Sequence, residues 1–238
     1  MPYYYYGFDW TYIVIILPCL LISLWANASV NNTFKRYSKQ LSSRRITGAQ
    51  AAQRVLAANG VANVRIEHVS GNLTDHFDPK SNVIRLSDNV YSSTSTAAIG
   101  VACHEAGHAV QYAQHYAPIK LRAAIIPITN IGSKLAMPLI LLGVLISSFG
   151  SSSGILIDIG ILCFSLSLVF QLVTLPVEFN ASRRAMSAIR NGDILTHEEI
   201  SGARKTLTAA AMTYVAATFV AFAQLLRIIL LFGGRRRD

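Results

Sequence analysis

The sequence predicts a mainly α-helical membrane protein with about four transmembrane helices and a small α+β part outside the bilayer. Of the 238 residues, 52% are hydrophobic and only 14% are charged, whereas soluble domains carry about 25% charged residues. Long apolar runs recur along the chain, and residues 31–118 instead alternate short strand and helix patterns with turns. The three cysteines form no C-x-x-C pair, which argues against a disulfide scaffold.

The first apolar run, Tyr12 to Val30, is long enough to cross a hydrocarbon layer of about 30 Å. The aromatic residues Tyr3–Tyr6 precede it, which suits a belt at the membrane surface. Ala26–Ala28 imitates a signal-peptidase site, but no Lys or Arg precedes the run and five follow it within residues 35–45. This polarity predicts that residues 1–30 form an uncleaved anchor with an external N-terminus.

The second apolar block, residues 119–177, predicts an interfacial segment followed by a transmembrane hairpin. Prolines interrupt residues 119–133, which suits a location along the membrane surface. Residues 135–149 and 155–177 have the length and composition of two spans, and the Gly- and Ser-rich turn 150–154 joins them. In residues 206–238 we expect a last transmembrane helix, to Phe232, and a basic tail.

The distribution of basic residues predicts the orientation. Residues 31–134 hold 12 Lys or Arg and residues 177–205 hold five, whereas the turn between the second and third spans holds none. The positive-inside rule therefore places both charged segments in the cytoplasm of a multi-pass plasma-membrane protein. With four spans the arginines of residues 235–237 lie outside, against this rule; alternatively, the last helix folds back or lies in the interface.

The segment 31–118 predicts a small α+β fold. Thr47 is a plausible N-cap for an Ala-rich helix, and residues 64–69 and 83–86 have strand patterns separated by turns. Residues 93–96 offer caps for a helix over 97–116. If the strand before this helix has a free edge, that edge can hydrogen-bond an extended peptide; an ordinary α+β hairpin is the alternative.

The motif His104–His108, H-E-A-G-H, lies within that last predicted helix. Residues four apart project from one helical face, so both imidazoles can bind one ion. Glu105 is then placed to accept a proton from a water that the metal activates. Two core histidines beside a surface glutamate are the alternative. The motif favours a zincin-like, more narrowly gluzincin-like, catalytic zinc site with one Zn²⁺ per chain.

A catalytic zinc site normally has three protein ligands, so a third ligand is required. In the longer motif H-E-x-x-H-x-x-G-x-x-H, the glycine would be residue 111 and the third histidine residue 114. This chain has Gln111 and Gln114 at these positions. Glu178 is the best candidate, because it follows the third span in the same compartment as the metal helix. An interfacial carboxylate paired with a neighbouring arginine is the alternative. Glu67, Glu198 and Glu199 lack comparable context.

Three features together resemble the YugP-type neutral zinc metallopeptidases of bacterial membranes: the H-E-A-G-H helix, the membrane hairpin and the segment L-P-V-E-F-N-A-S-R-R-A around Glu178. The segment D-H-F-D-P at residues 75–79 also resembles that family. A more distant similarity to HtpX-type membrane proteases implies His104, His108 and Glu178 as zinc ligands and Glu105 as base. Those proteins favour Asp four residues after the ligand glutamate, where this chain has Ser182.

This resemblance and the motif predict a metalloendopeptidase, a hydrolase of peptide bonds in protein or peptide substrates at the cytoplasmic face of the lipid bilayer. A donor to the oxyanion is also required, and the sequence leaves five candidates open: His76, Tyr112, Arg183, Arg184 and His197. Residues 178–205 are expected to return to the cytoplasm and to carry the third ligand. No nucleic-acid recognition motif accompanies the net charge of +9, and an oligomeric state cannot be read from the chain.

Two other classes of function are compatible with the motif. An intramembrane protease of the site-2 type has H-E-x-x-H on a membrane-spanning helix, but here the apolar run before His104 is short and polar residues follow it. A non-enzymatic membrane scaffold could retain a structural zinc site. Glu105 argues against a scaffold, because a structural site needs no base.

Overall fold

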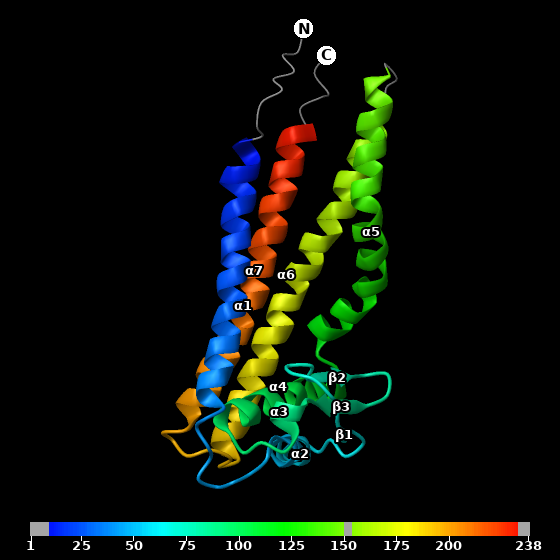
Figure 1. Ribbon diagram of the computed structural model, residues 1–238. Helices are drawn as coiled ribbons and strands as arrows, with labels where there is room; N and C mark the ends of the chain where they lie inside the picture. Colours follow the sequence, from blue (N-terminus) through cyan, green and yellow to red (C-terminus); the bar gives the residue numbers. More distant parts are fainter. Residues whose placement is uncertain (1–9, 150–153, 233–238) are drawn as a thin grey trace. The chain divides into compact units, whose positions relative to one another are not determined.

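The computed structural model describes residues 10–149 and 154–232 (Figure 1). The chain forms two compact units. The first comprises Met1–Trp25, Ala124–Leu172 and Val215–Asp238, and the second comprises Ala26–Ala123 and Val173–Tyr214. The aromatic run Tyr3–Tyr6, most of the turn 150–154 and the basic tail lie outside the described residues.

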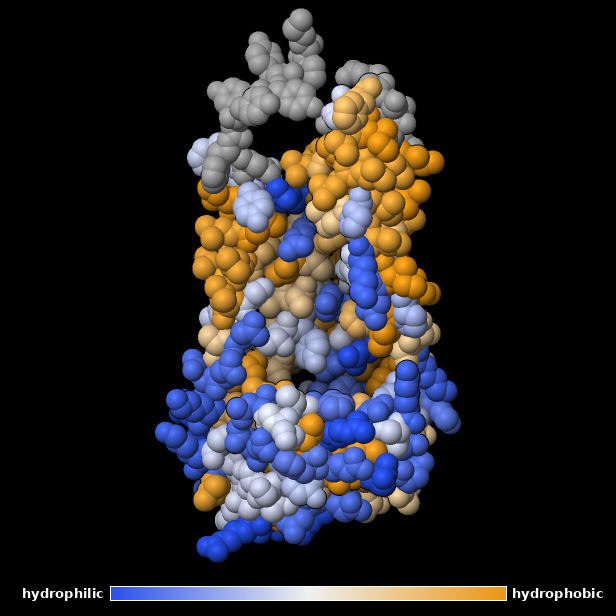
Figure 2. Space-filling view, turned by 45° about the vertical axis from the view of Figure 1, so that its right-hand side comes forward, coloured by the Kyte–Doolittle hydropathy of each residue, from blue (hydrophilic) through white to orange (hydrophobic). Residues whose placement is uncertain are grey.

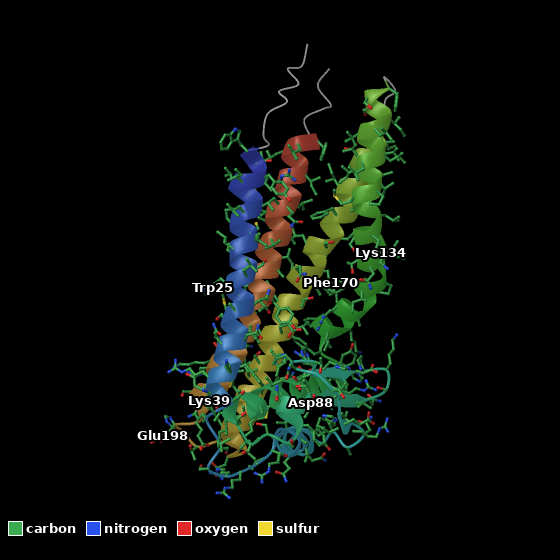
Figure 3. The ribbon with its side chains drawn as sticks, viewed as in Figure 1. Trp25, Lys39, Asp88, Lys134, Phe170 and Glu198 are labelled. Atoms are coloured by element: carbon green, nitrogen blue, oxygen red, sulfur yellow. The ribbon has the colours of Figure 1, made fainter. Side chains whose placement is uncertain are left out.

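Within the described residues, four long helices are apolar enough to cross a membrane, which confirms the predicted class. They are α1 (Leu17–Tyr37, preceded by the π-helical turn Tyr12–Ile16), α5 (Ala117–Ser148), α6 (Gly154–Asn191) and α7 (Ile200–Phe232). Hydrophobic residues dominate the visible surface of these helices, whereas hydrophilic residues dominate the surface around the strands (Figure 2). Trp25 projects outward from α1 and is 58% exposed, as expected of a side chain that faces lipid (Figure 3).

Two predicted boundaries differ from the structure. The segment 119–133 was expected to be separate from the span 135–149, but both belong to the single helix α5, with Pro127 and Pro138 inside it. Membrane helices tolerate such prolines, because neighbouring helices and side chains satisfy the backbone groups that the proline leaves unpaired. The last helix begins at Ile200, before the expected start of the span, and continues to Phe232 without a fold-back.

In the second unit, helix α2 (Gly48–Ala58) begins with a complete capping box: the Thr47 side chain accepts from the Gln50 backbone, and the Gln50 side chain accepts from the Thr47 backbone. Helix α4 (Thr96–Ala113) begins similarly, because Ser95 Oγ accepts from the Ala98 backbone N–H at 3.2 Å. These caps satisfy donors that a helix start leaves unpaired. Both predicted starts are thus confirmed to within one residue.

The sheet has three strands in the order β1-β3-β2: β1 (Arg65–His68), β2 (His76–Asp78) and β3 (Val83–Leu86). β3 pairs in parallel with β1 and antiparallel with β2. The expectation that the strand before the metal helix has a free edge is therefore wrong, because β3 is central. The sequence did not indicate β2, so its pairing with β3 was not foreseen. The short helix α3 (Asp88–Tyr91) connects β3 to α4.

Helix α4 lies in the core of the second unit. Ala97, Ile99, Ala102 and Cys103 are fully buried and belong to one hydrophobic cluster with α2, the strands, α6 and α7. Contact with α6 is close at Gly107, where an added Cβ would lie 2.8 Å from the carbonyl oxygen of Ala181. The absence of a side chain at this position therefore sets the separation between the helix that carries H-E-A-G-H and the helix that carries Glu178.

Gly107→Ala is expected to destabilise the protein by about 1–3 kcal/mol, the usual cost of overpacking a rigid contact. The new methyl group would meet backbone, which cannot rotate away as a side chain can. Thermal unfolding of the purified protein in detergent measures the effect. Gly154→Ala is the control, because among the described residues no atom outside its own helix backbone and chain neighbours lies within 4 Å of a Cβ built there. Equal unfolding temperatures for the two variants would contradict the close approach.

Candidate metal centre

His104, His108 and Glu178 come together in the second unit. The histidines lie one turn apart on α4, and Glu178 lies on α6. Nε2 of His104 is 3.2 Å from Glu178 Oε2, and Nε2 of His108 is 3.6 Å from the same oxygen. One nitrogen or oxygen atom from each of the three residues lies within 4.8 Å of the other two. The Glu178 side chain is only 3% exposed.

The second oxygen of Glu178 has its own partner. Arg122, near the start of α5, donates from Nη1 to Glu178 Oε1 at 3.1 Å. The carboxylate therefore directs one oxygen to the imidazoles and the other to a guanidinium. Burial lowers the pKa of His108, but hydrogen bonding to Glu178 and the charges of Glu105 and Glu178 outweigh it, so this pKa lies above its ordinary value. The carboxylates thus favour a positive charge beside His108.

Gln111 determines which nitrogen of His108 faces Glu178. The amide nitrogen of Gln111 donates to the Val177 carbonyl at 2.9 Å and to Asn180 Oδ1 at 3.0 Å, so its orientation follows from two acceptors. Its Oε1 lies 3.0 Å from His108 Nδ1 and must accept there. A neutral His108 is therefore protonated on Nδ1, which leaves the lone pair of Nε2 available as a ligand.

Ser182 has the corresponding position beside the other histidine. Its Oγ lies 3.1 Å from His104 Nδ1, and Nε2 of His104 faces Glu178. HtpX-type proteins favour an aspartate at this place in the sequence. Because this chain has a serine there, the sequence did not indicate which side chain contacts His104. The structure supplies that contact through a hydroxyl, one helical turn after Glu178.

A cavity of 160 Å³ adjoins these residues. His104, Glu105 and Glu178 line it, together with Asp75 and Tyr214. Glu105 is 9% exposed. Asp75 accepts from the Ser87 backbone and hydroxyl at 2.7 and 2.9 Å, while burial and the charge of Glu105 keep its pKa above the ordinary value. The cavity therefore brings a carboxylate and a phenol beside the candidate ligands.

The residues of this centre fit a zinc ion. Two imidazole nitrogens and one carboxylate oxygen are the donor set of one class of catalytic zinc site, which keeps a fourth position for water. The Nδ1 contact of His108 presents Nε2 to Glu178, and the buried carboxylates favour a cation at that place. Both the chemistry of the donors and their mutual distances are therefore compatible with a bound zinc ion.

Comparison with known proteins gives the same class. A family model described as "Putative neutral zinc metallopeptidase" matches residues 12–233. The "Putative membrane protease YugP" of Bacillus subtilis (strain 168) is 44% identical over 227 residues, which are 95% of this chain and 99% of that protein. The chain belongs to this metallopeptidase family. No solved structure matches it.

The five oxyanion donors that the sequence suggested lie elsewhere in the protein. None of them lines the 160 Å³ cavity. His76 is exposed on β2 and contacts the Thr74 carbonyl, and the Tyr112 ring lies against Phe77. Arg184 binds Asn180 and Gln114. Arg183 and His197 are exposed and line two other hollows.

The remaining acidic candidates lie outside the group with the two histidines. Glu67 pairs with Arg65 and Arg85, and Glu199 accepts from the backbones of Ser43 and Thr196. Glu198 belongs to the segment that connects α6 to α7, and Figure 3 shows it at the periphery of the molecule. Among these acids, only Glu178 belongs to the group with the two histidines.

Sequence reasoning missed three residues around the centre: Asp75, Arg122 and Tyr214. A signal existed for two of them. Arg122 is a charged residue within an apolar run, and Tyr214 is a phenol within the last apolar stretch. Polar groups in such segments are costly and mark functional positions by default. Asp75 belongs to the D-H-F-D-P segment, in which the sequence suggested only His76 as a candidate for the site.

Proposed function

We propose that the protein is a membrane-anchored zinc metalloendopeptidase that hydrolyses peptide bonds of protein or peptide substrates at the cytoplasmic face of the plasma membrane. One observation carries the proposal. Donor atoms of His104, His108 and Glu178 lie within 4.8 Å of one another, and Glu105 lines the 160 Å³ cavity together with His104 and Glu178. In this proposal those three residues hold one Zn²⁺ per chain, and Glu105 is the general base.

When bound, zinc polarises a carbonyl and lowers the pKa of a water toward about 7. Glu105 accepts the proton of the water that attacks the peptide carbon, and the same carboxyl then protonates the leaving amine. His104 and His108 keep their Nε2 atoms directed to the centre through Ser182 and Gln111. Arg122 holds the distal oxygen of Glu178, so one orientation of this carboxylate is favoured.

The oxyanion that forms during the attack needs a donor, whose removal commonly costs about 3 kcal/mol. Tyr214 joins the candidates, because it lines the cavity together with Glu105 and Glu178. The five donors suggested by the sequence would each require a rearrangement to reach the cavity.

β2 is the strand best placed to hold an extended substrate. It is an edge strand in the order β1-β3-β2, and among the described residues no strand pairs with its other side. Asp75, the residue immediately before β2, lines the cavity. An extended peptide that pairs with the backbone of β2 would therefore run past the candidate metal centre.

The basic residues support a cytoplasmic position for the centre. The two segments that contain the ligands, residues 31–134 and 177–205, hold 17 of the 21 Lys and Arg residues. Because basic loops are retained in the cytoplasm, the positive-inside rule favours this orientation.

Two alternatives have less support. An intramembrane protease of the site-2 type would carry the motif on a spanning helix, but α4 is not one of the four helices with a membrane-spanning apolar window. A scaffold with a retained zinc site would not need Glu105, which nevertheless lines the same cavity as His104 and Glu178.

Glu105→Gln should keep the metal and lose proteolysis, because the amide preserves shape but cannot accept the proton. A decrease of about 10²–10⁴-fold is expected for a general base. Cleavage of fluorescently labelled casein, with zinc measured by mass spectrometry, tests both parts. Full activity in this variant would exclude the mechanism. Substrates can then be identified by trapping them on the inactive variant in membranes.

Glu178→Ala should abolish stable zinc binding, whereas the wild type should hold about one zinc per chain. The loss should exceed the roughly 10–100-fold typical of a residue that only supports a ligand. Glu198→Ala is the matched control, because this glutamate lies outside the centre. Glu178→Gln retains the side-chain volume and separates ligand loss from misfolding. Zinc retained equally in Glu178→Ala and Glu198→Ala would refute the third ligand.

Gln111→Leu should weaken zinc binding by about 10–100-fold, because His108 loses the acceptor that fixes its tautomer. Competition with a chromogenic zinc chelator measures the affinity. Gln114→Leu is the control, since Gln114 lies three residues later, at the C-cap of α4, but binds Arg184 instead of a histidine. Equal zinc affinities in these two variants would argue against the assigned role of Gln111.

A further inference from the structure

A groove of 720 Å³ lies on α6 and α7 within the second unit, outside the proposed catalytic cavity. Its two ends differ in chemistry. Pro176, Phe179, Ala211 and Met212 line one end, Arg190 and Arg204 line the other, and Arg183 lies about midway along the α6 side. The groove residues recur every three or four positions along each helix, so the groove follows the helix axes.

The arginines of the groove are free to bind an anion. All three are exposed, and among the described residues no carboxylate forms an ion pair with them. No Asp or Glu lines the groove. A neighbouring hollow shares Arg190 and Arg204 and adds Lys205, while its single acid, Asp193, pairs with Arg44. The arginine end is therefore strongly electropositive.

The groove lies where two apolar helices acquire their charged residues. The apolar stretch of α6 extends to Val177, and that of α7 begins near Thr206. From Phe179 to Arg183 the helix rises about 6 Å, which is close to the thickness of about 5–8 Å of a headgroup layer. A phosphate beside Arg183 would thus place acyl chains against Phe179 and Met212, while Arg190 lies about 10 Å further along α6.

We propose that this groove binds an anionic phospholipid, with the headgroup along Arg183, Arg190 and Arg204 and the acyl chains at the apolar end. Basic pockets between membrane helices are suited to such headgroups. The exposed Phe179 favours a ligand with an apolar part over a soluble phosphate, because it would otherwise face water at the membrane surface. The lipid would also pack beside Ser182, which lines both the groove and the catalytic cavity.

Native mass spectrometry of the full-length protein in detergent tests the proposal. With matched acyl chains, the wild type should retain added phosphatidylglycerol in preference to phosphatidylcholine. Arg190→Gln/Arg204→Gln should bind phosphatidylglycerol about 25-fold more weakly, since each arginine near an anionic headgroup contributes about fivefold. The control Arg45→Gln/Lys80→Gln removes the same charge from exposed positions outside the groove and should bind as the wild type does.

Three results would overturn the proposal. The groove variant could bind phosphatidylglycerol as the wild type does. Both double variants could lose it equally, which would indicate a general charge effect. Millimolar glycerol phosphate, inorganic phosphate or an acidic peptide could displace it, which would indicate a soluble ligand. Zinc content measured in each variant checks that the second unit has folded.

Discussion

The buried carboxylate of Glu178 is the interaction on which the arrangement of this protein depends. A carboxylate that is 3% exposed is strongly unfavourable unless positive or donating groups surround it. Here His104 and His108 come from α4 and Arg122 comes from α5, while Glu178 itself lies on α6. Three helices must therefore meet at one point for the charge to be satisfied, and that point is the candidate metal centre.

Close packing of α4 on α6 makes this meeting precise. Gly107 allows the two backbones to approach at Ala181, and Gln111 binds the Val177 carbonyl and Asn180 from the same face of α4. These contacts are at neighbouring turns of both helices, so they determine the register of His108 against Glu178. A shift by one residue would remove the tautomer-fixing contact together with the packing.

Helix α6 connects the centre to the apolar, membrane-spanning part of the chain. α6 carries an apolar stretch, then Glu178 and Ser182, and then Arg183 and Arg190 along one continuous helix. Its buried face supplies the candidate ligand, and its exposed face supplies the arginines of the groove. One helix can serve both because residues three or four apart share a face. The proposed catalytic site and the proposed lipid site are therefore next to each other, because both include residues of α6.

Local patterns were sufficient for much of the fold and for three candidate residues of the centre, His104, Glu105 and His108. Hydropathy predicted the membrane helices because length and composition are properties of one segment. The spacing of His104 and His108 predicted their shared face because helical periodicity is local, and Thr47 and Ser95 marked helix starts for the same reason. Glu178 was found from its context at the end of a span and from the family resemblance.

The sequence by itself thus determined a four-helix membrane protein with an H-E-x-x-H helix and a companion glutamate. Only the tertiary structure decided which side chains complete the centre and that β1 and β2, not β3, are the edge strands. Arg122 meets Glu178 across 56 residues, Gln111 meets Val177 across 66, and Ser182 meets His104 across 78. β3 lies in the middle of the sheet because it pairs with both β1 and β2. Such pairings depend on how separate elements pack, and no periodicity within one element encodes them.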